Sequence, residues 1–432
     1  MKRLRVALPV FLLVCLLAVN FGVSAQEPVT VKLWMHVHPP RVPLDEELLA
    51  QFQEENPDIV VEYTTVPDQE WDTALATALA GGGGPDLFNQ ATFAIGDFYN
   101  QGILAPVNPQ AAGYEDQQAI FDAYAFGESL LAGAVFEDTL YGLPTELSTY
   151  ACYANDDLWE AAGLDPETDF PATWEALRDV AEQLTVRDES GAIVQRGFDF
   201  IWSNSIFMLL IFNPMVEQLG GNMIDEVNLT AHIDTPEVRQ VLSYWNDWVN
   251  TWQLGGPQYT FTRDAFLAGD LAISCDFGNW GVPQMEEAGI NYSIHPQPRW
   301  EEAVNNNAMA TYAYFFMVNA ASPPEVQEAA WRLAGYLTSF PQEYLDVAGL
   351  FQPKLDFVES EAFQENEIMP IFLEEMSVST YHPRIPAFFE VTDALMRMRD
   401  RVVVGGEDMD TVLAETEQEV NDILARAREA AQ

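Results

Sequence analysis

Strand-like and helix-like segments alternate along the N-terminal part of the chain, and this order limits the fold more than any other feature. Residues 29–34 and 59–65 carry apolar side chains at every second position, the period of a half-buried strand. Residues 44–52 and 71–79 instead repeat large apolar side chains every four positions, as one face of a helix does. Residues 85–88 follow as a third, short strand. This order is typical of a parallel sheet wound by crossover helices, so we predict an α/β fold.

The same kind of pattern returns in the rest of the chain, and no Pro-, Gly- or Ser-rich linker separates the two parts. Further strand-like segments occur at 150–154, 271–275 and 314–318. Thr173 is a predicted helix N-cap, and Ser322 opens a predicted capping box with proline at the first helical position. A last amphipathic helix is predicted over 409–427. A chain of 432 residues has room for two α/β lobes, and the missing linker indicates that it crosses between them more than once.

The N-terminus predicts an export signal. Three basic residues among the first five precede an apolar run at 6–19, and Val23-Ser24-Ala25 has the small side chains of a signal-peptide cleavage site. The apolar run is too short to span a membrane comfortably. We therefore expect an exported, soluble mature protein, either periplasmic or extracellular at the cell surface.

The charge excludes whole classes of partner. The chain has 67 acidic and 19 basic residues, a net charge of −48, and loss of residues 1–25 removes three basic residues and leaves −51. Phosphate backbones and anionic bilayers would repel such a surface, so we expect neither nucleic-acid binding nor docking on membranes by charge.

Two cysteines, Cys152 and Cys275, remain in the mature chain, each within a strand-like segment. In an oxidising compartment they could form a disulfide. They could equally be two buried small hydrophobic residues, and the sequence leaves both interpretations open.

No standard catalytic signature is present, neither a nucleophile elbow nor a zinc-protease motif nor a phosphate-binding loop. The run Gly81–Gly84 lacks the lysine that such a loop needs, and we interpret it as a helix stop. His36 and His38, two positions apart after the first strand, could bind zinc, but the three other histidines form no cluster that would supply further ligands. We therefore expect no metal and no cofactor, and two polar side chains in a loop that faces a cleft.

Aromatic residues at the ends of predicted strands are candidate ligand contacts. They are Trp34, Trp202, Trp280, Tyr312 and Tyr314. Open α/β sheets bind ligands at their carboxyl edges, where a flat ring offers a surface for the C–H groups of a sugar. The alternative for each ring is a place in the core.

Several segments match, in order and spacing, the motifs of one known family. Residues 52–59 read F-Q-E-E-N-P-D-I, and A-L-A-G at 78–81 precedes P-D-L at 85–87. Residues 141–158 carry Y-G-L-P and then Y-A-N-D-D-L, and residues 266–280 run from F-L-A-G-D-L-A-I to G-N-W. In this combination the chain resembles the family 1 extracellular solute-binding proteins of ABC importers, the maltose-binding-protein-like group.

The resemblance implies a two-lobed periplasmic-binding-protein-like fold, with two open sheets, a ligand cleft between the lobes and crossings near residues 145, 297 and 350. Residues 1–25 would be the signal peptide. Lobe 1 would comprise 26–145 plus 298–350, and lobe 2 would comprise 146–297 plus 351–432. The protein would be a monomer and not an enzyme, and it would carry a sugar or oligosaccharide to a membrane permease.

The resemblance also implies a set of cleft residues. Family members line the cleft after the first strand, at the P-D turn, in the crossover and in the G-x-W segment; here these positions are Trp34, His36, His38, Asp86, Asn89, Gln90, Glu146, Asn279 and Trp280. Trp202, Tyr312 and Tyr314 complete the predicted site, although many members have glycines near the two tyrosines. Asp86 has a second interpretation as a structural cap in its turn.

Two other functions fit parts of the sequence. A cationic solute, such as a polyamine or a basic peptide, would suit the negative charge. An exported glycan hydrolase would suit the many aromatic and carboxylate side chains, although no catalytic signature supports it.

Overall fold

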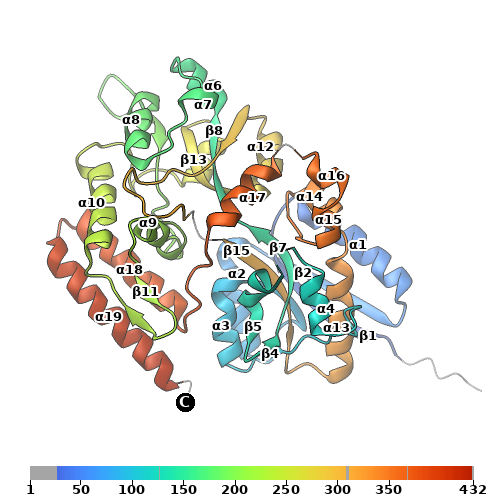
Figure 1. Ribbon diagram of the computed structural model, residues 1–432. Coiled ribbons are helices and arrows are strands. Elements are labelled where there is room, and N and C mark those ends of the chain that lie inside the picture. The colour runs from blue at the N-terminus through green and yellow to red at the C-terminus, as the bar shows by residue number, and fades with distance from the viewer. Residues whose placement is uncertain (1–26, 126, 308–310, 367, 431–432) are drawn as a thin grey trace, which may run out of the picture.

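The computed structural model describes residues 27–125, 127–307, 311–366 and 368–430. The predicted signal peptide lies outside the described residues. The chain forms two lobes, each built around one sheet with helices packed on it (Figure 1). In the described part of the chain, no helix is both long and apolar enough to cross a membrane.

The first three strands of the lobe 1 sheet confirm the predicted parallel arrangement. Its strand order is β2-β1-β3-β15-β4, and β7 pairs with β15. Strand β1 runs parallel to both β2 and β3, whereas β15 is antiparallel to β3. The strands are β1 (Val29–His36), β2 (Ile59–Val66), β3 (Leu87–Ala91), β4 (Leu104–Ala105), β7 (Leu143–Ser148) and β15 (Tyr312–Asn319). The helices are α1 (Arg41–Glu55), α2 (Asp68–Ala80), α3 (Thr92–Asn100), α4 (Gln117–Asp122), α5 (Gly127–Leu131), α13 (Pro324–Leu337) and α14 (Pro341–Ala348).

The predicted capping box at Ser322 is wrong. Helix α13 has Pro323 at its N-cap and no side-chain cap. The Ser322 hydroxyl instead donates to Oδ1 of Asp86, at 2.6 Å. The local pattern assigned the Ser322 hydroxyl to the helix N-terminus, but its partner is Asp86, 236 residues away in the chain.

Lobe 2 has a mixed sheet of order β14-β8-β13-β10-β9. Its strands are β8 (Tyr150–Asn155), β9 (Val186–Arg187), β10 (Ile193–Phe198), β13 (Leu271–Gly278) and β14 (Tyr292–His295). Its helices are α6 (Asp156–Ala161), α7 (Pro166–Asp169), α8 (Trp174–Leu184), the π-helical turn η2 (Met208–Phe212), α9 (Asn213–Gln218), α10 (Pro236–Asn250), α11 (Thr262–Leu267), α12 (Val282–Ala288), α17 (Met369–Val378), α18 (Phe388–Val403) and α19 (Met409–Ala430). Thr173 caps α8 as predicted, because its hydroxyl oxygen accepts from the Ala176 N–H at 3.2 Å.

Shorter elements complete the structure: η1 (Ala132–Ala134), β5 (Val135–Phe136), β6 (Thr139–Leu140), β11 (Ile224–Asp225), β12 (Thr230–Ala231), η3 (Asn279–Gly281), α15 (Leu355–Val358) and α16 (Glu361–Gln364).

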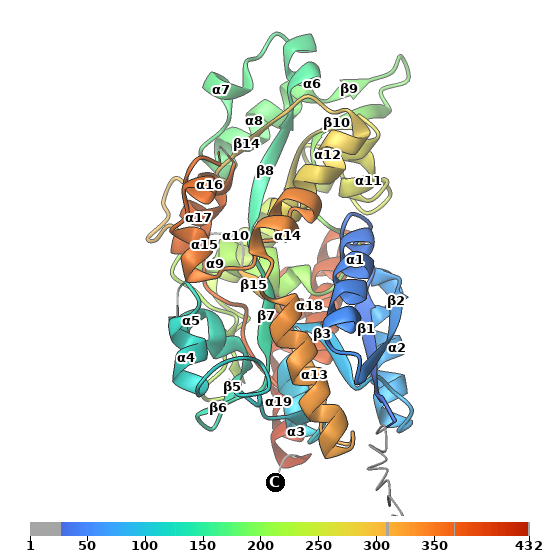
Figure 2. The same ribbon diagram turned by 90° about the vertical axis from the view of Figure 1, so that its right-hand side faces the viewer.

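The chain crosses between the lobes later than the sequence boundaries 145, 297 and 350. Strand β7 belongs to the first sheet and β8 to the second (Figure 2), so the first crossing lies between Ser148 and Tyr150. Residues 298–307 stay with lobe 2, since the Trp300 indole N–H donates to the carbonyl of Met215 at 2.9 Å. Lys354 still contacts lobe 1, where its ammonium lies 4.1 Å from the centre of the Tyr124 ring. Each boundary is set by contacts that are distant in sequence.

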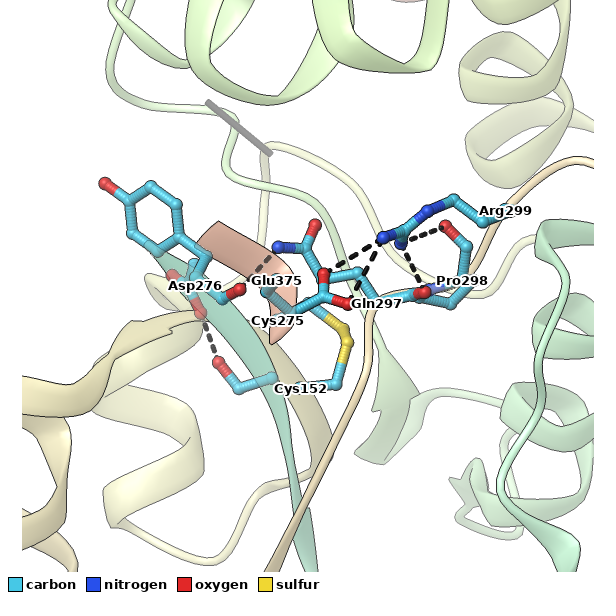
Figure 3. The surroundings of a disulfide bond; sticks show 9 residues. Cys152, Cys275, Asp276, Gln297, Pro298, Arg299 and Glu375 are labelled. Atoms are coloured by element: carbon cyan, nitrogen blue, oxygen red, sulfur yellow. Dashed lines mark hydrogen bonds and ion pairs between the residues drawn. A yellow bond between two sulfur atoms is a disulfide. The ribbon is translucent and has the colours of Figure 1, made fainter. Parts of the chain in front are cut away.

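The structure joins Cys152 and Cys275 in a disulfide (Figure 3). The two residues face each other across the antiparallel strands β8 and β13, at the point where the register between Ser274 and Phe277 shifts. The sequence left open a disulfide and two separate buried cysteines, and the structure supports the disulfide. Both side chains are also buried.

Glu217 on α9 joins three segments that are distant in the chain, and its titration makes stability depend on pH. Its carboxylate accepts from the amides of Asn213 and Asn307 and from the Thr380 hydroxyl. Burial raises the pKa of Glu217 to about 7. The folded state then binds more protons than the unfolded chain between about pH 4.5 and pH 7, so stability falls as the pH rises through this window.

We expect Glu217→Gln to remove part of this pH dependence. The measurement is the midpoint of thermal unfolding at pH 5.5 and pH 8 for the wild type and the variant. Glu328→Gln, at an exposed position on α13, is the control. Equal pH slopes in all three proteins would contradict the assignment to Glu217.

Candidate ligand-binding site

Three predicted residues meet at the carboxyl end of β1. The Asn89 side chain accepts from the His36 backbone N–H at 3.2 Å, and its amide nitrogen lies 2.9 Å from Nδ1 of His36. Because the amide nitrogen can only donate, Nδ1 is the acceptor and the imidazole proton is on Nε2. The Tyr314 ring stacks on His36 with centroids 4.4 Å apart. Burial, Arg41 and His38 hold the pKa of His36 well below its ordinary value, so this imidazole is neutral.

His38 contacts α14 instead of joining this cluster. Its Nε2 lies 2.8 Å from the carbonyl oxygen of Ala348. Burial, with a smaller contribution from Arg41, lowers the pKa of His38 to about 4. The two histidines therefore take different partners, and within the described residues no three or more His, Cys, Asp or Glu side chains are placed to hold a metal ion.

A buried ionic network lies beneath the cluster. Arg41, the first residue of α1, is 1% exposed and donates to the His36 carbonyl. Its guanidinium lies 3.2 Å from Asp45 and 4.0 Å from Glu146. Asp45 also accepts from the hydroxyls of Tyr63 and Tyr344, each at 2.8 Å. The carboxylate of Glu146, a predicted ligand contact, thus faces a buried cation, and Glu146 is itself 3% exposed.

Lobe 2 contributes Trp280, which follows β13. The Trp280 indole N–H donates to the Tyr312 hydroxyl of lobe 1 at 2.5 Å. The Tyr312 ring also lies 5.5 Å from the ring of Tyr150, at the start of β8. Trp280 and Tyr314 are half-buried, so both rings keep some surface exposed.

This arrangement requires a glycine at position 278, because the Trp280 indole and the Ser148 hydroxyl occupy the space that a side chain would need. A Cβ atom there would lie 2.5 Å from the Trp280 indole nitrogen and 2.4 Å from the Ser148 hydroxyl oxygen, both shorter than real carbon contacts. Asn279 joins the lobes directly: its amide nitrogen donates to the Gly349 carbonyl at 2.6 Å, and its oxygen accepts from Ser148 at 3.1 Å.

The structure places the other predicted residues apart from this cluster. Asp86 accepts from the Lys32 backbone N–H at 2.9 Å and from Ser322, so it fills the role of a structural cap in its turn. Gln90 is 1% exposed and donates to Asp72 at 3.0 Å. Trp202 is a core residue of lobe 2, and its indole N–H donates to Oδ1 of Asp199 at 2.7 Å. Trp34 packs against the core beside Phe88.

One further side chain, Arg263 on α11, lies in the cluster. Its guanidinium carbon is 4.7 Å from the centre of the Trp280 ring. We call the cluster the interlobe site; its members are His36, Arg41, Asn89, Glu146, Tyr150, Arg263, Asn279, Trp280, Tyr312 and Tyr314. Two surface hollows lie elsewhere: one of about 470 Å³ between α18 and α19, and one of about 500 Å³ beside Lys354.

One known protein family matches most of this chain. Residues 39–342 match the family described as bacterial extracellular solute-binding protein, which is well over half of the chain. The chain belongs to this family.

Sequence relatives of the solute-binding protein include proteins named for the oligosaccharides that they bind. A maltotriose-binding protein of Pyrococcus abyssi is 21% identical over 314 residues, which cover 72% of this chain and 63% of the relative. An arabinooligosaccharide-binding protein of Halalkalibacterium halodurans is 25% identical over 344 residues, covering 75% and 72%.

Solved structures show the same two-lobed fold. The binding protein Lmo0181 of Listeria monocytogenes, in complex with cycloalternan, superposes with a TM-score of 0.79 at 18% identity and covers 92% of this chain and 99% of its own. The maltodextrin-binding domain MalE of Bdellovibrio bacteriovorus, bound to maltotriose, has a TM-score of 0.78 at 20% identity, with coverage of 92% and 100%. The expected two-lobed periplasmic-binding-protein-like fold is confirmed.

Sequence analysis of the solute-binding protein missed Arg41 and Arg263. Arg41 carries a weak signal, because a cation in the first turn of a helix opposes the helix dipole and needs a compensating partner. Arg263 is on a different element from Trp280, and no motif marks it. Only the folded chain brings it to the indole.

Proposed function

We propose that this chain is the extracytoplasmic solute-binding component of an ABC importer, and that it captures a sugar or oligosaccharide between its lobes for a membrane permease. It would be exported by residues 1–25 and would bind its ligand without converting it. Both curated relatives named above bind oligosaccharides, and the match to the family supports the transport role.

The observation that carries the proposed ligand class is which side chains of the interlobe site remain accessible. The accessible side chains include the rings of Trp280 and Tyr314 and the guanidinium of Arg263, whose side chain is 23% exposed. The Asp45 and Glu146 carboxylates are buried and face Arg41. Rings stack on the C–H faces of a sugar, while uncharged and charged donors hold its hydroxyls.

The same observation disfavours a polyamine. An ammonium group needs an accessible carboxylate, whereas Asp45 and Glu146 are buried against the Arg41 cation and Asp276 is buried against Arg263. The net charge of the whole chain acts at longer range and is screened within about 8 Å at physiological salt.

Calorimetric titration of the mature chain tests the proposal. The ligands are maltotriose, arabinotriose, galacto-oligosaccharides and spermidine, and we expect binding of at least one saccharide. Trp280→Ala should weaken that binding roughly 30-fold, the effect of about 2 kcal/mol typical of a central tryptophan. Trp252→Ala, a half-buried tryptophan after α10, is the matched control and should leave affinity unchanged. Binding of spermidine alone, or equal losses in both variants, would contradict the proposal.

A further inference from the structure

Arg263 is held in place by a carboxylate next to the disulfide. Its Nε donates to the backbone carbonyl of Asp276 at 3.0 Å and lies 3.5 Å from Oδ2 of the same residue. Asp276 also accepts from the hydroxyls of Thr262 and Ser274 and is 3% exposed. Asp276 directly follows Cys275 in the bulge of β13 (Figure 3), and its carbonyl and carboxylate hold the Arg263 guanidinium.

The terminal nitrogens of Arg263 are available to a ligand. Among the described residues, neither Nη1 nor Nη2 has a hydrogen-bond acceptor, and the ion pair with Asp276 runs through Nε. Aromatic rings surround the guanidinium carbon, with Trp280 at 4.7 Å and both Phe207 and Phe261 at 5.7 Å. An arginine clamped at Nε and flanked by rings presents its two outer N–H groups as a rigid fork.

We propose that Arg263 is a specificity-determining residue of the interlobe site, whose outer N–H groups donate to two neighbouring oxygens of a neutral saccharide stacked on Trp280. Asp276 is the positioning residue, and it also balances the charge of Arg263. This inference rests on the proposed function and deepens it, because it selects neutral over carboxylated sugars. Two arginines of the site, Arg41 and Arg263, face three carboxylates, those of Asp45, Glu146 and Asp276, so an anionic ligand would meet no net positive charge.

The first test compares Arg263 with another arginine that lies against a tryptophan ring. Arg178 on α8 lies 5.4 Å from the ring of Trp252, on lobe 2 but outside the interlobe site. Arg263→Gln should weaken binding of the neutral saccharide found by titration about 10- to 100-fold, since it removes charge-assisted hydrogen bonds. Arg178→Gln should leave affinity unchanged. Arg263→Lys should recover only part of the loss, because an ammonium keeps the charge and lacks the fork.

The second test separates a positioning role from a merely structural one. Asp276→Asn keeps the shape of the side chain and leaves Arg263 without its counter-charge. The ratio of affinity for trigalacturonate to affinity for the neutral saccharide should rise at least about 10-fold in this variant. If the substitution only disturbed the structure, the affinities for both sugars would fall equally and their ratio would stay unchanged.

The outcomes distinguish this inference from the proposed function. If the wild type binds no saccharide, the proposed function fails. If the wild type binds a saccharide and Arg263→Gln binds it equally well, or if Asp276→Asn leaves the ratio unchanged, the function stands and the roles assigned here are wrong.

Discussion

Replacing Arg41 by methionine is expected to destabilise the protein by about 3–5 kcal/mol, the cost of leaving buried charges without their partner. Arg41 is 1% exposed and lies between Asp45 and Glu146, both nearly inaccessible to water. Methionine fills most of the volume of the arginine side chain but compensates neither carboxylate. The hydrogen bond to the His36 carbonyl is lost as well.

The size of this loss should depend on pH. Burial already raises the pKa of Asp45, and the Arg41 guanidinium opposes that increase. Without the guanidinium the buried carboxylates take up protons at higher pH and become neutral. The deficit relative to the wild type should therefore be largest near pH 8 and shrink towards pH 5.

Urea unfolding at pH 5 and pH 8 measures both effects. Arg332→Met is the control, because Arg332 is 41% exposed and pairs with the exposed Asp58 at 3.5 Å. An exposed pair contributes about 0–1 kcal/mol, so this variant should unfold almost as the wild type does. Equal losses in the two variants, or a deficit that does not change with pH, would show that Arg41 is not compensating buried carboxylates.

The local pattern of the sequence was sufficient for the strands and helices near the N-terminus. The two-residue period of β1 and β2 and the helical period of α1 and α2 come from burial of one face, which the sequence records directly. The parallel pairing of β1 with β2 follows from the helix between them. The helix cap at Thr173 was equally local, because donor and acceptor are three residues apart.

The interlobe site was predictable only in part, because its contacts join distant segments. Trp202 and Trp280 both follow strands, and both were predicted ligand contacts. The fold places Trp202 within 5.2 Å of Trp245 in a core of aromatic rings, whereas Trp280 reaches Tyr312 of the other lobe. Ser322 shows the same limit, since its local pattern predicted a cap but Asp86 is its partner. The role of each of these residues depends on a neighbour that is distant in sequence, which the local pattern of residues does not specify.

Removing the disulfide is expected to have the largest effect on stability. Cys152 and Cys275 are 123 positions apart in the sequence. The chain-entropy model gives about 5 kcal/mol for a loop of this length, because the crosslink restricts the unfolded chain. The double variant Cys152→Ala/Cys275→Ala loses this restriction and little volume.

Guanidinium unfolding with and without reductant distinguishes the crosslink from packing. The oxidised wild type should unfold at a higher denaturant concentration than the double variant, and reductant should bring the wild type close to the variant. The variant itself should not respond to reductant. If the oxidised wild type and the variant unfold together, the disulfide contributes nothing to stability.

Because β13 leads from Cys275 through Asp276 to Gly278 and Trp280, saccharide affinity measured on the same variant also shows whether the crosslink holds the lobe 2 side of the site. A loss of affinity in the folded variant would link the disulfide to ligand binding, and unchanged affinity would restrict its role to stability.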